Sequence, residues 1–226
     1  MKYEIIGGAY PAVKCILNRG EKMRCEGGSM SWMTDGLSMK TEGGGSIGKA
    51  LGRSISGEGI FFNVFEAEKD EQEIAFSASF PGRILAINLK EGQSIIAQKG
   101  AFLACTEGIN VQMHFKKKLG AGLFGGLGFF MQKFTGTGTL FLEIDGNLEE
   151  KTLQAGERIK IDAPYLAMMT ESCSMDIEKI KGVKNMVFGG EGMFNTVVTG
   201  PGKVWLQTMP MSALAMAIAK YMPSKE

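Results

Sequence analysis

The sequence predicts an all-β protein, made of three tandem repeats in a pseudo-threefold body and one short C-terminal helix. Three stretches of the chain overlay on one another, each opening on a glycine and ending fourteen residues later on a threonine. The three stretches are Gly20 to Thr34, Gly92 to Thr106 and Gly156 to Thr170. The offset from the first stretch to the second is the same at both ends (92 − 20 and 106 − 34, both 72), and so is the offset from the second to the third (156 − 92 and 170 − 106, both 64). A constant offset over this length indicates a structural unit that buries its apolar face against its neighbours.

Short apolar runs assign the repeats to β-structure. One run follows a glycine-containing turn in each repeat, at residues 60–65, 139–144 and 203–207. The runs are rich in β-branched and aromatic residues, which is typical of strands in a sandwich or barrel. With this alignment, the middle loop of the first repeat is expected to be seven residues shorter than that of the second. The turns are Gly57-Glu58-Gly59, Gly136-Thr137-Gly138 and Gly200-Pro201-Gly202.

The repeats favour one compact body over residues 1–226. A helix is expected only at the end, over residues 211–221, where strong helix formers lie between Pro210 and Pro223. This segment is too short to span a bilayer, so we expect it to pack on the β body or on a partner subunit. The repeat boundaries are expected at about 1–70, 71–145 and 146–209.

Composition and charge exclude several classes of protein. With 44% hydrophobic and 22% charged residues, the chain has enough apolar material for a sizeable globular core and does not have the composition of a disordered protein. A formal net charge of +1 provides no overall field to attract nucleic acid or an anionic membrane. Nucleic acid is therefore not an expected partner.

Cysteine usage indicates a reducing compartment. The four cysteines lie far apart and form no C-x-x-C pair, unlike the densely spaced cysteines of small secreted scaffolds. The first residues already have the pattern of a strand and not of a signal peptide. We therefore expect a cytoplasmic protein with free, mostly buried thiols at Cys15, Cys25, Cys105 and Cys173.

Two glycine-rich motifs match nucleotide-binding loops only in part. Residues 43–50 come within one residue of a P-loop, but Ala50 stands where Ser or Thr would hold Mg²⁺. Residues 120–125 match G-x-G-x-x-G, a motif that requires a strand before it and a long helix after it. Both motifs fall between the threonine of a repeat and its closing turn, so we interpret them as loops.

The sequence contains no recognisable catalytic or metal-binding constellation. His114 is the only histidine, and no Asp, Ser or Cys lies at a spacing that would join it in a triad or a metal cluster. The acidic residues between Glu66 and Glu73 are typical of a solvated turn. We therefore expect no enzyme activity, no cofactor and no metal.

The second repeat alone carries a basic cluster followed by an uncharged, glycine-rich segment. This segment, residues 119–132, is shorter than the roughly 20 residues of a transmembrane helix. It is either a buried connection between strands or an exposed surface for subunit contact or membrane apposition. The candidate binding residues of such a surface are Lys116, Lys117, Lys118, Leu123, Phe124, Phe129 and Phe130.

Three motifs carry a resemblance to a known family. They are residues 43–53 running into Ser56–Gly59, Phe80-Pro81-Gly82, and residues 120–126 running into Phe129–Lys133. Over essentially its whole length, the chain resembles the small bacterial and archaeal proteins related to the mitochondrial biogenesis (altered inheritance of mitochondria) proteins. The resemblance implies a fold similar to that of the tryptophan RNA-binding attenuator protein, with TRAP-like repeats of the double-stranded β-helix or β-sandwich type. It implies no established activity.

Two functions stay open at this point. The first is a non-catalytic, self-associating scaffold or binding protein, a homo-oligomer whose glycine-rich loops and C-terminal helix contact other proteins or a membrane surface. The alternative is a regulator that binds a small ligand or RNA, like the attenuator protein. A shared fold is not a shared site, and the lysines at 116–118 are the one modest basic cluster that this alternative has.

Overall fold

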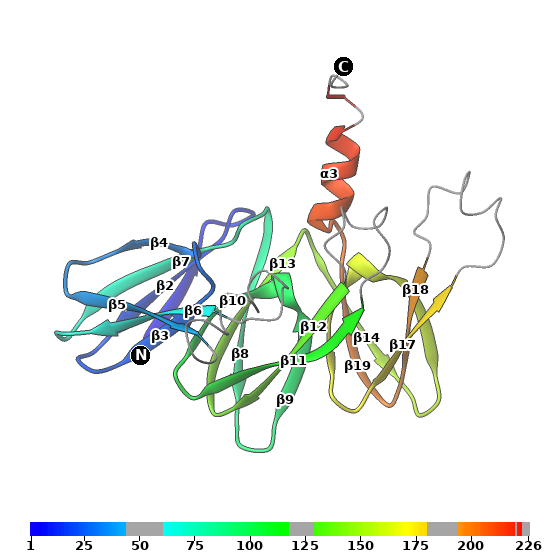
Figure 1. Cartoon of the computed structure of the whole chain (residues 1–226), viewed down its shortest axis with the longest axis horizontal. Coiled ribbons are helices and arrows are strands. Elements are labelled where there is room, and N and C mark those ends of the chain that lie inside the picture. The colour runs from blue at the N-terminus through cyan, green and yellow to red at the C-terminus, as the bar shows by residue number, and fades with distance from the viewer. Residues whose placement is uncertain (44–60, 118–128, 180–193, 220, 223–226) are drawn as a thin grey trace. The chain divides into compact units, whose positions relative to one another are not determined.

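The computed structural model describes residues 1–43, 61–117, 129–179, 194–219 and 221–222 (Figure 1). Within these ranges the chain forms strands β1 to β19, the short 3-10 helices η1 (Lys99–Ala101) and η3 (Ala163–Tyr165), and one α-helix, α3 (Met211–Ala219). The strands form open sheets. The prediction of an all-β protein with one short C-terminal helix is confirmed.

The chain divides into two compact units, and the first contains residues 1–90, 102–109 and 137–143. It holds two sheets. Sheet A has the strand order β1 (Lys2–Ile6), β2 (Ala12–Leu17), β7 (Gln72–Ser77), β4 (Met30–Met33). Sheet B has the order β5 (Leu37–Gly43), β6 (Phe61–Ala67), β3 (Lys22–Cys25), β10 (Phe102–Thr106), β13 (Gly138–Asp145), β8 (Gly82–Leu89).

The core of the first unit lies between sheets A and B. Every second residue of β2 points into it, because successive side chains of a strand face opposite sides. These residues, Val13, Cys15 and Leu17, are fully buried. Across the core, the rings of Phe65 on β6 and Phe76 on β7 meet edge to face, with their centroids 6.3 Å apart. Each large side chain buried in this way stabilises the fold by about 1.5–3 kcal/mol.

The second unit contains residues 91–101, 110–136 and 144–226. Sheet C has the order β11 (Ile109–Lys117), β12 (Phe129–Gly136), β9 (Ser94–Gln98), β16 (Leu166–Thr170), β19 (Gly202–Gln207), β14 (Leu148–Leu153). Sheet D has the order β15 (Arg158–Asp162), β18 (Phe194–Thr199), β17 (Ser174–Lys179). Their shared core includes Met131, Ile161, Met169, Val198 and Val204.

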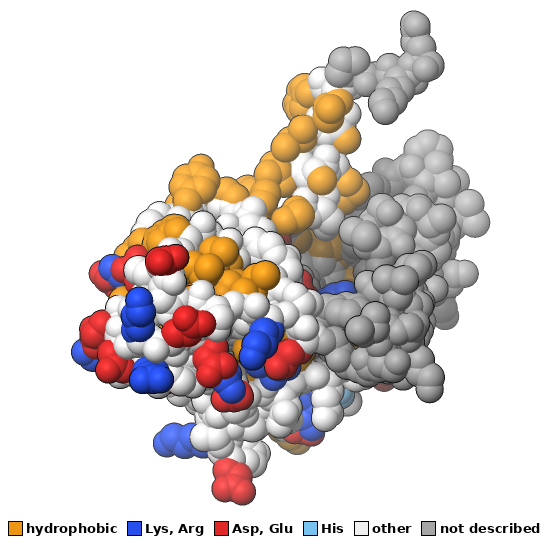
Figure 2. Space-filling model, turned by 60° about the vertical axis from the view of Figure 1, so that its left-hand side comes forward, with side chains coloured by type: hydrophobic (Ala, Val, Ile, Leu, Met, Phe, Trp, Pro, Cys, Tyr) orange, Lys and Arg blue, Asp and Glu red, His pale blue; other side chains and the backbone are white. Residues whose placement is uncertain are grey.

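Helix α3 follows β19 and is fixed at its first residue. The Asp145 carboxylate accepts a hydrogen bond from the backbone N–H of Met211 at 2.8 Å. None of the nine residues of α3 is buried, and hydrophobic side chains are exposed along it (Figure 2). Burial raises the pKa of Asp145 above its usual value, because the carboxylate is partly removed from water; the Met211 N–H opposes this rise.

The strand registers recur along the chain, and the strands that carry a β-bulge do so with the offsets read from the sequence. In β10, Phe102 pairs with Leu142 and Ala104 with Phe141, which leaves a β-bulge between them. The same bulge lies at the equivalent place in the third repeat, between Leu166 and Met168 of β16, and in the first, between Met30 and Trp32 of β4. We therefore describe β2–β7, β8–β13 and β14–β19 as the first, second and third repeats.

The threonine that ends each sequence repeat has the same contact in all three. Its hydroxyl accepts a backbone N–H from the strand that closes the repeat, at 3.0–3.1 Å. The pairs are Thr34 with Glu73, Thr106 with Thr139 and Thr170 with Lys203. This hydrogen bond ties the two strands together and is a physical reason for the threonine at this position.

The structure corrects the sequence alignment of the first repeat. Its closing strand is β7, which pairs with β4 as β13 pairs with β10, whereas the run at residues 60–65 belongs to β6 and pairs with β3. The interval from threonine to closing strand runs from 34 to 72 in the first repeat and from 106 to 138 in the second. The interval of the first repeat is therefore six residues longer and not seven shorter.

The misalignment has a physical cause at the start of the closing strand. A side chain at Gly138 would overlap the Thr106 hydroxyl, and the backbone there has a φ of +154°, so the second repeat requires glycine. In the first repeat Gln72 takes this place, and its side chain accepts a hydrogen bond from the Thr34 hydroxyl at 2.8 Å. The glycine signature is therefore absent where β7 begins.

Candidate interaction surface

The predicted loop surface lies only partly within the described residues. Lys116 and Lys117 end β11, while Lys118, Leu123 and Phe124 lie outside the described ranges. Two further members of the predicted surface begin β12. Phe129 is 5% exposed and its ring meets that of Phe115 edge to face at 6.3 Å, while Phe130 is half-buried. Phe129 is thus a core residue of the second unit and not part of an exposed surface.

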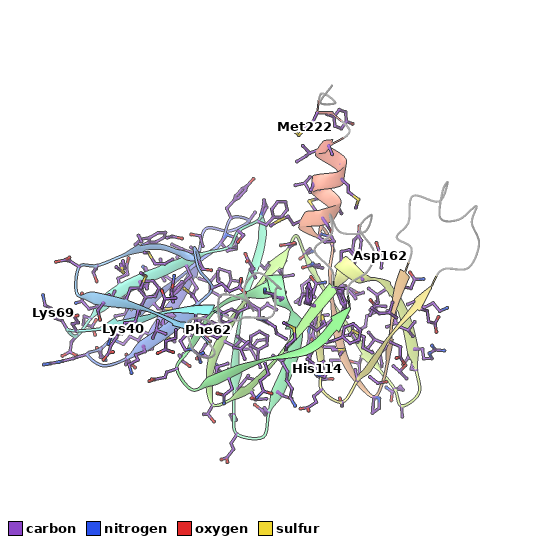
Figure 3. All side chains as sticks on the ribbon, viewed as in Figure 1. Lys40, Phe62, Lys69, His114, Asp162 and Met222 are labelled. Atoms are coloured by element: carbon purple, nitrogen blue, oxygen red, sulfur yellow. The ribbon has the colours of Figure 1, made fainter. Side chains whose placement is uncertain are left out.

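The two nucleotide-like motifs also lie mostly outside the described ranges. Only Gly43 of the P-loop-like motif belongs to a described strand, as the last residue of β5, and residues 120–125 are not described. Among the described residues, no group of three or more His, Cys, Asp or Glu side chains is placed to hold a metal ion. His114 lies exposed on β11 (Figure 3).

The cysteines are placed as structural residues. All four are free and buried, as predicted. Burial raises the pKa of the Cys15, Cys25 and Cys105 thiols to about 12, because the thiolate would lose its hydration. These thiols are protonated at neutral pH, and a protonated thiol is a poor nucleophile.

The edge strands of the described sheets show where the three repeats differ. Edge strands β5, β11 and β17 are the same strand of three successive repeats, so this edge has no neighbour among the described strands of any repeat. Strands β8 and β14 are a second such set. Strand β1 covers β2 and has no equivalent among the described strands of the later repeats. The edges at β4 and β15 are different. Their equivalents in the other repeats, β10 and β16 for β4 and β3 and β9 for β15, are paired on both sides.

The exposed edge at β4 carries large apolar side chains. Trp32 is 42% exposed and Met33 37%. The equivalent residues of β10 and β16 are at most 3% exposed, because β3 and β9 pair alongside them. These equivalents are Ala104 and Cys105 in the second repeat, and Met168 and Met169 in the third.

Side-chain hydrogen bonds hold the outer residues of β4 in place. The indole N–H of Trp32 donates to Glu73 Oε1 at 2.9 Å, and the Ser31 hydroxyl donates to the Ser77 hydroxyl at 2.8 Å. The polar end of the indole is thus satisfied while much of its apolar ring stays accessible. An aromatic side chain held in this way is suited to contact another protein surface.

At the open edge of β15, an apolar side chain is also less buried than its counterparts. Ile159 is half-buried, although the equivalent Met23 and Ile95 are buried. On the same strand, Lys160 and Arg158 form ion pairs with Glu178 of β17 at 3.0 and 2.7 Å. Hydrogen bonds from these two side chains hold the pKa of Glu178 below its usual value. Such exposed pairs contribute little to stability and can rearrange.

The sequence analysis did not predict this surface, because it looked for differences between the loops of the repeats and not between the neighbours of their strands. The signal was nevertheless present in the repeat offsets. If each repeat pairs with the one before it, the first and last repeats must each lack a neighbour. Trp32 and Met33 lie in the first repeat, and no described strand pairs with β4 on the side where β3 and β9 cover their counterparts.

Comparisons with known proteins agree with the fold. A Streptococcus pyogenes protein described as uncharacterised is 30% identical over 223 residues, which cover 95% of this chain and 88% of the relative. The crystal structure of a Streptococcus pyogenes protein matches with a TM-score of 0.80 and 25% identity, over 98% of this chain and 99% of that one. Within the described ranges, no helix has the length and apolarity needed to cross a membrane. The family model for mitochondrial biogenesis AIM24 matches residues 3–209, so the chain belongs to this family.

Proposed function

We propose that this protein is a non-catalytic scaffold that self-associates, and that the edge of sheet A at β4 forms part of the contact. One observation carries the proposal: Trp32 and Met33 are exposed at repeat positions whose counterparts are buried by a neighbouring strand. Exposed apolar area along the open side of an edge strand is a template for pairing with another chain. A second protein chain would supply the missing cover.

The edge at β4 lacks the devices that usually prevent such pairing. A bulge often blocks an edge strand, but the bulge of β4 recurs in β10 and β16, which pair on both sides. Within β4, the residues are Met30, Ser31, Trp32 and Met33, without charge or proline. The edge is therefore competent to pair.

Other observations support the remaining parts of the proposal. The absence of catalysis is proposed because the described residues assemble no reactive group: three thiols have their pKa raised to about 12 and the one histidine is exposed on a strand. A cytoplasmic location is proposed because all four cysteines are free. We also propose that the glycine-rich segment before β12, residues 119–128, contacts a protein partner or a membrane surface.

The test is the mass of the protein in solution across a concentration series, by native mass spectrometry and sedimentation velocity. We expect wild-type oligomers at micromolar concentration, and a dissociation constant at least about tenfold weaker for Trp32→Glu with Met33→Lys, because both charges would be buried at positions that are apolar in the other repeats. Met39→Glu is the matched control, since Met39 is exposed on β5, an edge that stays open in every repeat. A wild type that is monomeric throughout, or a double variant that associates as wild type does, contradicts the proposal.

A further inference from the structure

We infer that β4 of one chain pairs antiparallel with β15 of a second copy of this chain. The inference rests on the proposed self-association and names its partner, its direction and its register. It starts from the observation that, in the described chain, β4 and β15 are the two strands left open in one repeat and paired on both sides in the others.

Sheets D and A are two halves of the same pattern. Sheet B runs β5-β6-β3-β10-β13-β8 and sheet C runs β11-β12-β9-β16-β19-β14, so each joins three strands of one repeat to three of the next. Sheet D, read as β17-β18-β15, is the first half of this order. Sheet A, read as β4-β7-β2, is the second half, with β1 added outside β2. Joining β15 to β4 of another chain restores the six-stranded order.

The register of the new pair follows from the two existing ones. In sheet B, Ala104, Cys105 and Thr106 face Cys25, Arg24 and Met23; in sheet C, Met168, Met169 and Thr170 face Ala97, Ile96 and Ile95. The two sets differ only by the repeat offsets, because β10 is carried onto β16 and β3 onto β9. The same offsets carry β10 back onto β4 and β9 forward onto β15. In the resulting register, Trp32, Met33 and Thr34 of one chain face Ile161, Lys160 and Ile159 of the other.

The side chains fit this register. Trp32 would lie beside Ile161, an aromatic and β-branched pair of the kind that stabilises neighbouring strands. Thr34 would face Ile159, which is half-buried without a neighbour. Met33 would lie along the methylenes of Lys160, whose charged end can stay in water.

The charge of Lys160 does not oppose the pairing. Its equivalent Arg24 lies in the middle of sheet B, paired on both sides, and its guanidinium donates to the Ile109 carbonyl at 3.0 Å. The same guanidinium lies over the Phe62 ring, 4.4 Å from its centre. Ile109 begins the strand after β10, and its equivalent in the first repeat is Leu37. In the inferred interface, the equivalent carbonyl is that of Leu37 in the second chain.

The inferred contact is directional. A symmetric dimer in which β4 pairs with β4 would leave β15 open in both chains and would not restore the six-stranded order. Pairing of β15 with β4 joins unlike surfaces, so each chain keeps one free edge of each kind. Such head-to-tail contacts close into a ring when the rotation permits, and otherwise extend as a filament.

Cysteine cross-linking tests the direction and the register together. Facing residues of antiparallel strands have Cα atoms about 4.5–5.5 Å apart, within the range that a disulfide bridges. The native cysteines are all buried and give little background. The full-length variants Lys160→Cys and Met33→Cys are oxidised separately and after mixing with subunit exchange. We expect a covalent dimer in the mixture at about tenfold the yield of either variant alone.

The controls separate this inference from the proposed function. Met39→Cys mixed with Lys160→Cys is the matched pair, because Met39 is exposed but lies on β5. A native mass that is oligomeric, combined with no selective cross-link or with self-linking of Met33→Cys alone, overturns the head-to-tail register and leaves self-association standing. A wild type that is monomeric at every concentration overturns the proposed function itself. A selective cross-link in an oligomeric protein supports both.

Discussion

Met33 in the first repeat and Met169 in the third are the same residue at the same repeat position, yet their environments differ. Met33 is 37% exposed and Met169 is 1% exposed. Both follow the β-bulge within their own strand, and both pair on one side with the closing strand of their own repeat. Of the two, Met169 alone has a second neighbour among the described strands, Ile96 of β9. Burial at this position is therefore decided by the preceding repeat and not by the residue itself.

Truncating the two methionines gives the largest contrast. Met169→Ala is expected to lower the free energy of unfolding by about 2–5 kcal/mol, because it opens a cavity in the core of the second unit. Met33→Ala is expected to cost about 1 kcal/mol or less at low protein concentration, since much of its surface is already in water. Urea unfolding followed by circular dichroism measures both values.

Protein concentration then distinguishes an isolated edge from one covered by a neighbour. If a second chain covers β4, the wild-type midpoint rises with concentration, and Met33→Ala loses most of that rise. Met169→Ala keeps it, because its cavity lies within one chain. Equal costs for the two truncations at low concentration would mean that Met33 is already buried in the single chain, contrary to the comparison.

The repeat threonines give a smaller contrast of the same kind. Thr170→Val keeps the shape but removes the acceptor of the Lys203 N–H at a half-buried side chain, so we expect a loss of about 1 kcal/mol. Thr34→Val removes the equivalent acceptor from Glu73, where water can replace it because Thr34 is exposed. We expect that loss to be about 0.5 kcal/mol in the dilute chain. Thermal unfolding of the two variants at matched low concentration checks this order, and a costlier Thr34→Val would reverse it.

The sequence was sufficient for the fold class, the C-terminal helix and the buried thiols. The constant offsets located the repeats. Each repeat forms the same hydrogen bonds, so the turn glycine and the acceptor threonine recur at the same spacing. The alignment failed where Gln72 stands in place of a turn glycine. The Gln72 side chain accepts a hydrogen bond from the Thr34 hydroxyl, so the glycine that marks this position in the other repeats is absent. Phe129 was assigned to a surface because an apolar loop and a buried strand start have the same composition.

The candidate surface was harder to predict for a different reason. No motif marks Trp32 and Met33, because they have the apolar character expected of a core strand. What exposes them is that β4 has a paired neighbour on one side only among the described strands, which is a property of topology. It becomes visible only when the register shows which repeat pairs with which.

The turn glycines are the position at which the three repeats should behave alike, so they give the smallest contrast between repeats. Gly20, Gly92 and Gly156 have φ values of +83°, +77° and +78°, and a methyl group on any of them would meet nothing within 4 Å. Each Gly→Ala change is therefore expected to cost about 1 kcal/mol, from backbone conformation alone. Urea midpoints at low and high protein concentration measure the three costs. Equal, concentration-independent values mean that the repeats are locally equivalent, so the contrast between Met33 and Met169 reflects the missing neighbour. A cost that is larger in the first repeat alone would instead trace that contrast to a difference in the intrinsic stability of the two units.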